Sequence, residues 1–492
     1  MTPPTVNPLA LPEIRSLAGL YLSNKDALAC SQVCKDWAKE FVRSIWHTID
    51  FHAHTIFPEL DPATIQKYSH YILAVKNITQ SCHLEVLKAI KDHQLWTIGV
   101  IMHKDEQFVS DCYNLIRRHN TTLRVANIAL KHTRYRTPQS FQLDALLPAT
   151  STVHPVAPWS KLKDLMIEKC VISRATLSTI LRRCPELRLL DLWSTQVTPN
   201  EDGSVDDFQH PGVRDFVSKI TDCVYTDLTL PERSRSLFVH FPNLKTFSTY
   251  GGSNERLPVL QFKEEVERWC PRLDALQTNR SSGKPMVQMM VHGFRSLEYI
   301  RFASDKLTPE VVLAMLRHKD SLRFLTAFTP TQLSVAEFFD QAQVPPVDDK
   351  ILEARWMTQS LLRKCHKLEE FWLPELAMSM DEVEKMEWGC KGLKDLRIRI
   401  QGLDTAESID RVIHLLKTKR RESRQRGVRM NDTDEAKIAV ENPRPDTTET
   451  ERAPAVGEQE YRQLALEERV VQHLLKFDKL TTLWLGRPIT RL

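Results

Sequence analysis

The stretch CPELRLLDL at residues 184–192 places leucines in the pattern L-x-x-L-x-L, three residues after a cysteine. The stretch CKGLKDLRI at residues 390–398 repeats the pattern with an isoleucine at its end. Seven further stretches follow it or a near variant, with Cys, Phe, Trp or Lys in the first position. The first leucines of the nine stretches are Leu162, Leu187, Leu244, Leu273, Leu297, Leu322, Leu368, Leu393 and Leu480. A unit that recurs in this way predicts an array of stacked structural repeats.

The spacing of these leucines indicates what one repeat contains. Successive first leucines are 25, 29, 24 and 25 residues apart at 162–187, 244–273, 273–297 and 297–322. That length accommodates one short strand with inward leucines and one helix packed behind it. Apolar residues at helical spacing predict the helices at 174–183, 262–269, 308–317, 356–364 and 406–417. Longer gaps of 57, 46 and 87 residues are expected to hold missing units or insertions, and residues 95–98 and 123–128 are weaker early units.

These units resemble leucine-rich repeats of the cysteine-containing type. The resemblance implies an α/β fold class, with a curved solenoid of parallel strands inside and helices outside over residues 61–417. In other units the cysteine position holds Phe or Trp, which no metal or thiol chemistry would tolerate. We therefore expect Cys184, Cys270, Cys365 and Cys390 to be small buried residues that pack between strand and helix.

The outward strand positions of such a solenoid form a broad binding surface. Several of them carry aromatic residues or arginines, the residue types that dominate interface energetics. The candidate substrate-binding residues are Trp193, Tyr250, Tyr299, Arg301, Trp372, Arg397, Arg399 and Trp484. The alternative is that several of these aromatic side chains pack against one another or cover the core.

The N-terminal segment 9–51 has a different pattern, with three short helical stretches. Pro12 suits the first turn of a helix, and the polar break 23–26 offers N-cap residues for a second helix. About 45 residues cannot bury all the apolar positions of these helices by themselves. Part of this apolar surface is therefore expected to meet a partner or the rest of the chain.

This segment resembles an F-box. The residues that carry the resemblance are Leu11-Pro12-Glu13-Ile14, Tyr21-Leu22, Asp26-Ala27-Leu28, Val33-Cys34, Trp37 and Ile45-Trp46. The segment departs from the family pattern in two ways: Arg15 stands where family members have an apolar residue, and the first half is shorter by one residue. The resemblance implies docking to a Skp-family adaptor, which links the chain to a cullin–RING ubiquitin ligase. The residues carried over as adaptor-binding are Leu11, Pro12, Ile14, Leu17, Leu28, Val33, Cys34 and Trp37. The alternative is an N-terminal helical cap with Trp37 and Trp46 in its core.

Residues 418–460 have a charged, Pro- and Thr-rich composition with few large apolar side chains. Such a composition predicts a disordered insertion before a terminal repeat or cap at 461–492. The run 417–429 contains seven basic residues and one acidic residue. It is a candidate nuclear import signal or nucleic-acid contact, and the alternative is a solvated loop.

The composition is that of a globular chain with no general affinity for nucleic acid. Of 492 residues, 42% are hydrophobic and 26% charged, with a formal net charge of +4. No membrane segment or secretory signal is recognised, and the ten cysteines predict reduced thiols in the cytoplasm or nucleus. The phosphate-loop, dinucleotide-binding, zinc-protease and nucleophile-elbow motifs are absent from the sequence, and His47, His52 and His54 lack further ligands at metal spacing. We therefore expect no catalytic residue, no cofactor and no metal.

These observations lead to one principal hypothesis. The chain is expected to have a flexible segment at 1–8, an F-box-like module at 9–60 and the repeats behind it. Its expected function is a non-catalytic substrate receptor of a Skp–cullin–F-box ubiquitin ligase, which binds an unidentified protein substrate on the repeats. The alternative function is a leucine-rich-repeat scaffold for protein binding with no link to a ligase.

Overall fold

The computed structural model describes most of the 492 residues. The described residues are 9, 11–19, 21–52, 62–103, 105–130, 159–200, 208–219, 223–224, 236–249, 259–278, 294–303, 309–328, 359–385, 387–403, 405–427, 456–485 and 490–491. The chain forms two compact units and passes between them at three places: after Thr249, after Lys263 within helix α9 (Val259–Trp269), and after Leu273. Unit 1 comprises Met1–Thr249 with Glu264–Leu273, and unit 2 comprises Tyr250–Lys263 with Asp274–Leu492.

Unit 1 begins with three helices, α1 (Pro12–Gly19), α2 (Asn24–Ser31) and α3 (Lys35–His47), and continues as a parallel sheet. Its strands lie side by side in chain order and pair in parallel. They are β1 (Thr48–Asp50), β2 (Ala74–Ile78), β3 (Thr97–Met102), β4 (Val125–Leu130), β5 (Asp164–Glu168), β7 (Leu189–Asp191), β9 (Asp215–Ser218) and β10 (Thr246–Thr249). Two short strands, β6 (Val171–Ser173) and β8 (Gln196–Thr198), pair with each other in a separate sheet.

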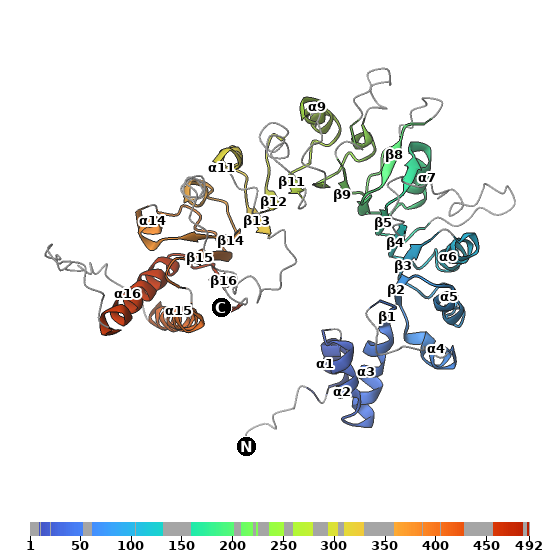
Figure 1. The fold of residues 1–492 in the computed structure, drawn as a ribbon, viewed down its shortest axis with the longest axis horizontal. Coiled ribbons are helices and arrows are strands. Elements are labelled where there is room, and N and C mark those ends of the chain that lie inside the picture. The colour runs from blue at the N-terminus through green and yellow to red at the C-terminus, as the bar shows by residue number, and fades with distance from the viewer. Residues whose placement is uncertain are drawn as a thin grey trace. The chain divides into compact units, whose positions relative to one another are not determined.

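Helices lie along one face of the sheet in unit 1 (Figure 1). They are α4 (Pro62–Tyr68), α5 (Ser81–Leu87), α6 (Glu106–Arg118) and α7 (Arg174–Arg183), with short 3-10 turns η2 (Ser69–Tyr71) and η5 (Leu237–His240). Local sequence starts these helices: the Asp105 carboxylate accepts hydrogen bonds from two backbone amides of α6, and the Ser173 hydroxyl accepts one in α7. Side-chain capping of this kind satisfies amides that have no partner within the helix.

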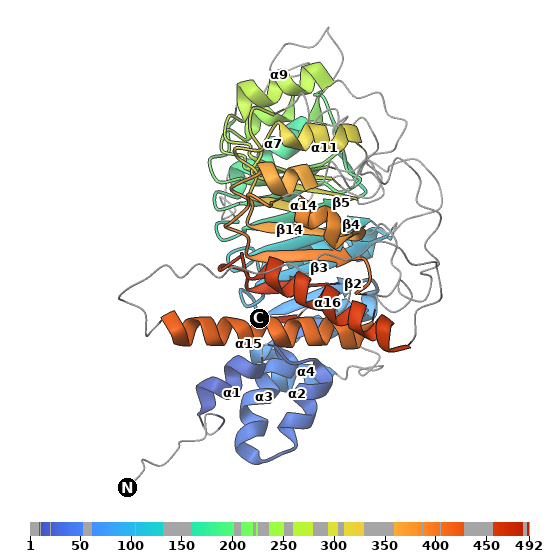
Figure 2. The same ribbon diagram turned by 90° about the vertical axis from the view of Figure 1, so that its left-hand side faces the viewer.

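Unit 2 repeats the arrangement. Its strands are β11 (Ala275–Thr278), β12 (Tyr299–Ala303), β13 (Phe324–Phe328), β14 (Glu370–Met378), β15 (Asp395–Ile400) and β16 (Thr482–Trp484), all parallel, followed by the antiparallel β17 (Thr490–Arg491). The helices of unit 2 include α11 (Pro309–Leu316), α14 (Met380–Lys385), α15 (Ala406–Gly427) and α16 (Val456–Leu474). Figure 2 shows α15 and α16 side by side.

The core lies between the strands and the helices. All nine first leucines of the sequence repeat are buried, from fully covered to at most 7% exposed at Leu273. Along β5 and β15 buried and partly exposed residues alternate, as expected when one sheet face packs on helices. The predicted parallel sheet with outer helices is therefore confirmed as a mixed α/β fold, which is compatible with a solenoid.

One predicted boundary needs correction. The segment 418–460 was expected to be disordered, but 418–427 belongs to α15 and 456–460 to α16, while 428–455 lies outside the described residues. The physical reason is pairing between the two helices. Lys419 binds Glu468, and the Arg420 guanidinium donates hydrogen bonds of 2.6 Å to the carbonyls of Leu480 and Phe477. Lys419 thus pairs with an acidic side chain, and Arg420 with backbone carbonyls, that lie 49 to 60 positions later in the sequence.

Candidate interaction surfaces

Two of the N-terminal helices, α1 and α3, pack closely at a glycine. A Cβ atom added at Gly19 would lie 2.2 Å from the hydroxyl of Ser44, so α1 approaches α3 more closely than a larger residue would allow. Helix α2 is capped by Ser23, whose hydroxyl accepts a hydrogen bond of 3.2 Å from the amide of Asp26. These local features fix the three helices as one module.

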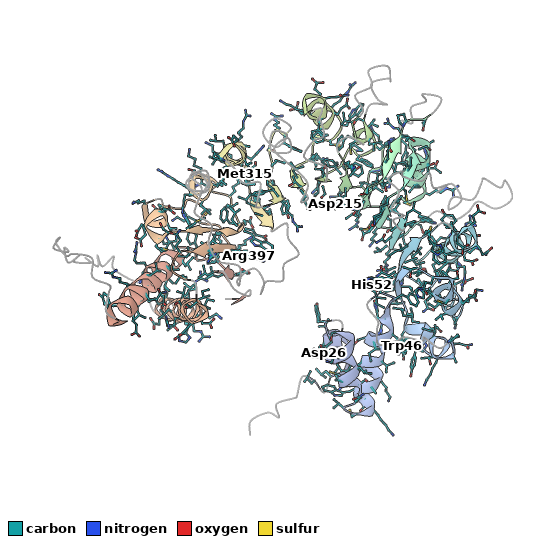
Figure 3. The ribbon with its side chains drawn as sticks, viewed as in Figure 1. Asp26, Trp46, His52, Asp215, Met315 and Arg397 are labelled. Carbon is teal, nitrogen blue, oxygen red and sulfur yellow. The ribbon has the colours of Figure 1, made fainter. Side chains whose placement is uncertain are left out.

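The interior of this module is continuous with the first repeat. Its buried residues include Ala27, Phe41 and Ile45. Trp46 is also buried, and its ring stacks on that of Tyr68 with centroids 4.8 Å apart; Figure 3 labels Trp46 near α4. Strand β1 follows α3 directly and pairs with β2. The module is therefore joined to the sheet by aromatic packing as well as by the chain.

Several apolar residues lie on the outer surface of the module. Of the eight predicted adaptor-binding residues, seven are exposed, and these are Leu11, Pro12, Ile14, Leu17, Leu28, Val33 and Cys34. Trp37 is half-buried and packs on Phe41, with ring centroids 5.5 Å apart. The exposed fraction reaches 54% at Leu17 and 62% at Val33.

This apolar exposure is concentrated in one part of the chain. Eleven large apolar residues are exposed among those described, and seven lie between residues 9 and 33. We call these seven the apolar N-terminal surface: Leu9, Leu11, Ile14, Leu17, Tyr21, Leu28 and Val33. Leu9 and Tyr21 were not among the predicted adaptor-binding residues. Large apolar patches on a folded protein generally mark an interaction site.

In unit 2, five of the predicted substrate-binding positions share neighbouring strands. One row of matching register positions crosses β12 to β16. Along this row stand Arg301 in β12, Thr326 in β13, Trp372 in β14, Arg397 in β15 and Trp484 in β16. Tyr299 lies two residues before Arg301 in β12. The sheet therefore brings together residues that are up to 185 positions apart in the sequence.

Contacts among the side chains of this row leave fewer of them free to bind a partner. The Arg397 guanidinium lies over the Trp372 ring, 4.2 Å from its centroid, and donates hydrogen bonds of 2.8 and 2.9 Å to the Asp395 carboxylate. The hydrogen bond to Asp395 raises the pKa of Arg397 further, so the side chain stays charged but paired. Tyr299 contacts Phe324, with ring centroids 6.1 Å apart. Trp372 is thus paired with an arginine of the set, and Tyr299 with an aromatic residue outside it.

The other predicted positions have different outcomes. Arg301 is exposed and Arg399 is half-buried. Tyr250 and the side chain of Trp484 lie outside the described residues. Trp193 was predicted to be an outward strand position, but β7 ends at Asp191 and Trp193 follows it in unit 1. Ser194 then adopts a left-handed backbone with φ of 53°, which turns the chain away from the strand direction.

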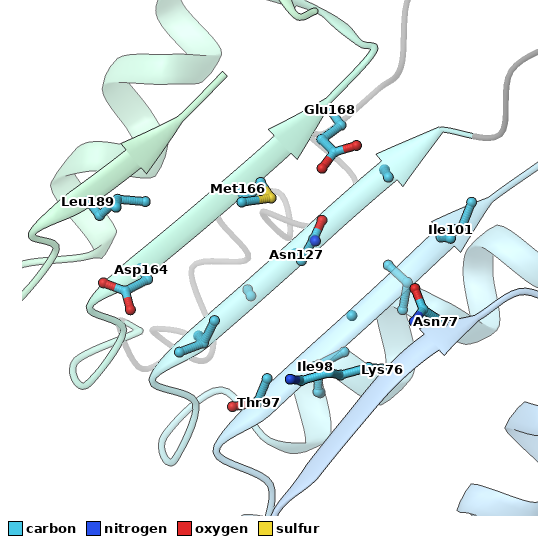
Figure 4. A pocket seen from close by; sticks show the side chains of 15 residues that line it. Lys76, Asn77, Thr97, Ile98, Ile101, Asn127, Asp164, Met166, Glu168 and Leu189 are labelled. Atoms are coloured by element: carbon cyan, nitrogen blue, oxygen red, sulfur yellow. The ribbon is translucent and has the colours of Figure 1, made fainter. Parts of the chain in front are cut away.

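A hollow of about 430 Å³ lies over β2 to β5 in unit 1 (Figure 4). Its lining combines apolar side chains, such as Ile98 and Met166, with the polar Asn127 and with Asp164 and Glu168 on β5. Within the described residues, the side-chain Oδ1 atoms of Asn127 and of the nearby Asp191 are buried without a hydrogen-bond partner. The sequence prediction did not include this hollow, although the alternation of strand β5 could have placed both of its acidic residues on the outward face.

Burial changes the acidity of this surface. The pKa of Asp191 is raised to about 6, first by burial and then by the negative charge of Glu168. The pKa of Asp164 is also raised, by burial and by Asp215. The buried Oδ1 atom of Asp191, which has no hydrogen-bond partner among the described residues, favours a ligand group that donates a hydrogen bond.

The repeat cysteines are buried, as the sequence predicts. Burial raises the pKa of Cys184, Cys365 and Cys390 to about 12, and raises that of Cys270 as well. Cys270 Sγ donates a hydrogen bond to the carbonyl of Phe241 at 3.3 Å. Because a thiol at such a pKa carries little thiolate, these cysteines are packing residues.

Two further properties concern the whole of the described chain. Its residues include no group of three or more His, Cys, Asp or Glu side chains placed to hold a metal ion. None of the helices in this part has the length and apolar character that a membrane crossing needs. No protein-family model matches the chain, and no curated protein matches it either.

Proposed function

We propose that the protein is the substrate-recognition subunit of a Skp–cullin–F-box ubiquitin ligase. In this role the N-terminal helices bind a Skp-family adaptor, and the outward strand face binds a protein substrate. The chain supplies binding energy and orientation, and the ubiquitin-transfer chemistry belongs to its partners. One observation carries the proposal: seven of the eleven exposed large apolar residues of the described chain lie on the apolar N-terminal surface.

The arrangement of α1 to α3 supports this role. The residues that resemble adaptor contacts are exposed, whereas Ala27, Phe41, Ile45 and Trp46 form the interior. Leu17 and Val33 are 54% and 62% exposed, so covering them fully in an interface would contribute roughly 0.8–1.9 kcal/mol each. A shallow hollow lined by Pro12, Leu17 and Glu40 lies on the same surface.

The test is capture of a purified Skp-family adaptor by the full chain. The variant Leu17→Asp with Val33→Asp places two charges on the apolar N-terminal surface and should reduce adaptor affinity by at least about tenfold. The matched control is Leu313→Asp with Leu464→Asp, which alters exposed leucines elsewhere and should leave affinity unchanged. Because all four substituted side chains are exposed, melting temperatures should stay close to that of the original chain.

Binding of the adaptor that survives deletion of residues 9–48 would contradict the proposal. A second function, a protein-binding scaffold without a ligase link, is favoured by one contact: Trp46 stacks on Tyr68 and joins the module to the repeats. In a scaffold of this kind the module is a cap. Deletion of the module should then unfold the repeats. The original chain should capture no adaptor, so the Leu17→Asp, Val33→Asp variant should show no loss of adaptor binding.

A further inference from the structure

The residue directly before each strand occupies the same place in every repeat. In unit 1 this position is basic in five consecutive units of the sheet, from β4 to β10. We call these residues the basic ladder: Arg124, Lys163, Arg188, Arg214 and Lys245. Trp96 holds the position before β3, at one end of the ladder.

Backbone hydrogen bonds hold the ladder in register. The amide of Lys163 donates to the carbonyl of Arg124 at 2.8 Å, and the amide of Arg188 donates to that of Lys163 at 2.7 Å. The same bond of 2.8 Å joins Arg214 to Arg188, and Lys245 to Arg214. Since neighbouring strands are about 4.8 Å apart, the five positive charges form a row about 19 Å long.

The side chains of the ladder face solvent. Four of them are exposed, and Lys163 is half-buried. Within the described residues none of the five forms an ion pair or a side-chain hydrogen bond. Arg124 lies over the ring of Trp96, 4.2 Å from its centroid, and Trp96 is itself 39% exposed. The ladder therefore begins with a cation–π pair at the surface.

Acidic residues nearby do not neutralise the row. Asp164 and Asp215 follow Lys163 and Arg214 on the sheet face, at matching positions on either side of Leu189. Lys163 and Arg188 attract the Asp164 carboxylate, but burial and Asp215 outweigh them and keep its pKa raised. Like charges about 4.8 Å apart repel each other, so a uniform row is a local cost that the fold does not require.

We propose that the basic ladder binds an extended acidic segment, rich in Asp and Glu, of the protein that the repeats recognise. This inference rests on the proposed substrate-binding role and names the chemistry of the substrate. The row is narrow, because the carboxylates of Asp164 and Asp215 border it. Its single aromatic residue stands at one end, whereas single-stranded nucleic acids are bound along rows of aromatic platforms. Both features favour a thin acidic peptide over a phosphate backbone.

The experiment measures binding of a fluorescent deca-glutamate peptide to the full chain by anisotropy at low salt. The variant Arg188→Glu with Arg214→Glu should weaken binding by at least about tenfold, because it replaces two attractions with two repulsions. The control Lys25→Glu with Lys91→Glu makes the same change in net charge at exposed lysines of unit 1 away from the ladder. It should weaken binding by less than about twofold.

Equal binding by the ladder variant and the control would overturn the inference. Tighter binding of an unlabelled oligothymidylate than of the peptide, with the same dependence on Arg188 and Arg214, would overturn it in favour of nucleic acid. Neutral Arg188→Gln with Arg214→Gln should give an intermediate loss, and a thermal melt verifies that each variant is folded. The ladder variants should still capture the Skp-family adaptor, so loss of peptide binding and loss of adaptor binding are separate failures.

Discussion

The two units use one repeat position in opposite ways. Before the strands of unit 1 stand five basic residues without ion pairs among the described residues, the basic ladder. Before β12 to β15 of unit 2 stand Glu298, Arg323, Glu369 and Lys394, which alternate in charge, while Asp274 precedes β11 and Thr481 precedes β16. Arg323 binds Glu298 at 3.6 Å and Glu369 with an Nε–Oε1 distance of 2.8 Å, and Lys394 binds the second oxygen of Glu369.

The electrostatics follow from this alternation. Hydrogen bonds from Lys394 and then Arg323 lower the pKa of Glu369, and the hydrogen bond to Glu369 raises that of Arg323. The repeating backbone thus fixes where the side chains stand, and the residue chosen there decides whether the row is neutralised within the chain or by a partner. In unit 2 the charged residues before β12 to β15 form ion pairs with one another, whereas the basic ladder of unit 1 has no ion-pair partner among the described residues.

The largest expected effect tests whether the units share one kind of core. Leu187 in unit 1 and Leu393 in unit 2 are both fully buried first leucines. Replacement of either by Ala should lower the free energy of unfolding by about 2–5 kcal/mol, measured by denaturant titration. Leu17→Ala, at an exposed leucine, is the control and should cost less than about 0.5 kcal/mol. If the replacement lowers the free energy of unfolding only slightly in one unit, the two units differ in their cores as well as in their surface charges.

The next effect concerns a buried ion pair of unit 2. Glu467 is fully buried, and Arg411 donates hydrogen bonds of 2.7 and 2.9 Å to its carboxylate. Burial raises the pKa of Glu467, but the hydrogen bonds from Arg411 and Ser408 outweigh it and leave the pKa lowered. Arg411→Met should therefore lower the melting temperature by several degrees, because it leaves a buried carboxylate unpaired. Lys391→Met, at an exposed pair with Glu387, should leave it nearly unchanged; an equal loss would contradict this role.

Acid should weaken both units through buried histidines. Burial lowers the pKa of His119 in unit 1 and of His473 in unit 2 to about 4, and neighbouring Arg118 and Lys476 add to the effect. Between the ordinary pKa of about 6.5 and about 4, the unfolded chain binds more protons than the folded one. Stability should therefore fall as pH decreases from 6.5 towards 4, by several degrees in a thermal melt. His119→Asn should flatten this dependence, and an unchanged profile would contradict it.

The smallest effect on stability, and the sharpest test of the comparison, is to exchange the two charge patterns. Glu298→Lys with Glu369→Lys makes the four positions before β12 to β15 uniformly basic. It should lower the melting temperature by no more than a few degrees, because the pairs are only partly buried, and should increase affinity for the acidic peptide. Arg188→Glu in unit 1 should raise the melting temperature slightly while weakening that affinity. If both exchanges leave peptide binding unchanged, the contrast between the units has no bearing on binding.

Periodic patterns predicted most of the repeat fold. The helix expected at 174–183 has these bounds in α7, and the early units expected near 95 and 123 contain β3 and β4. The unit of β9 was missed because its buried anchor is Val213, preceded by Gly212 instead of a leucine pattern. The helical extension of α15 was missed because composition alone does not show that Lys419 and Arg420 meet partners some 50 to 60 residues later.

The candidate surfaces were predictable to different degrees. Exposure of Leu17 and Val33 followed from a module too small to bury them. The row of Arg301, Trp372 and Arg397 followed from strand alternation, but the stacking of Arg397 on Trp372 depends on register between distant strands. The basic ladder was not found, because its members occupy the variable position directly after the first apolar residue of each unit, which the leucine pattern leaves open, and are 25 to 39 residues apart along the unit 1 sequence.

The antiparallel strand β17 has a consequence for building longer arrays from this chain. Every other pairing in unit 2 is parallel, so each strand presents an edge on which one more repeat can be stacked. β17 pairs with β16 in the reverse direction and closes that edge. Repeats appended after residue 492 would therefore have no parallel template, and an engineered extension should be inserted upstream of β16.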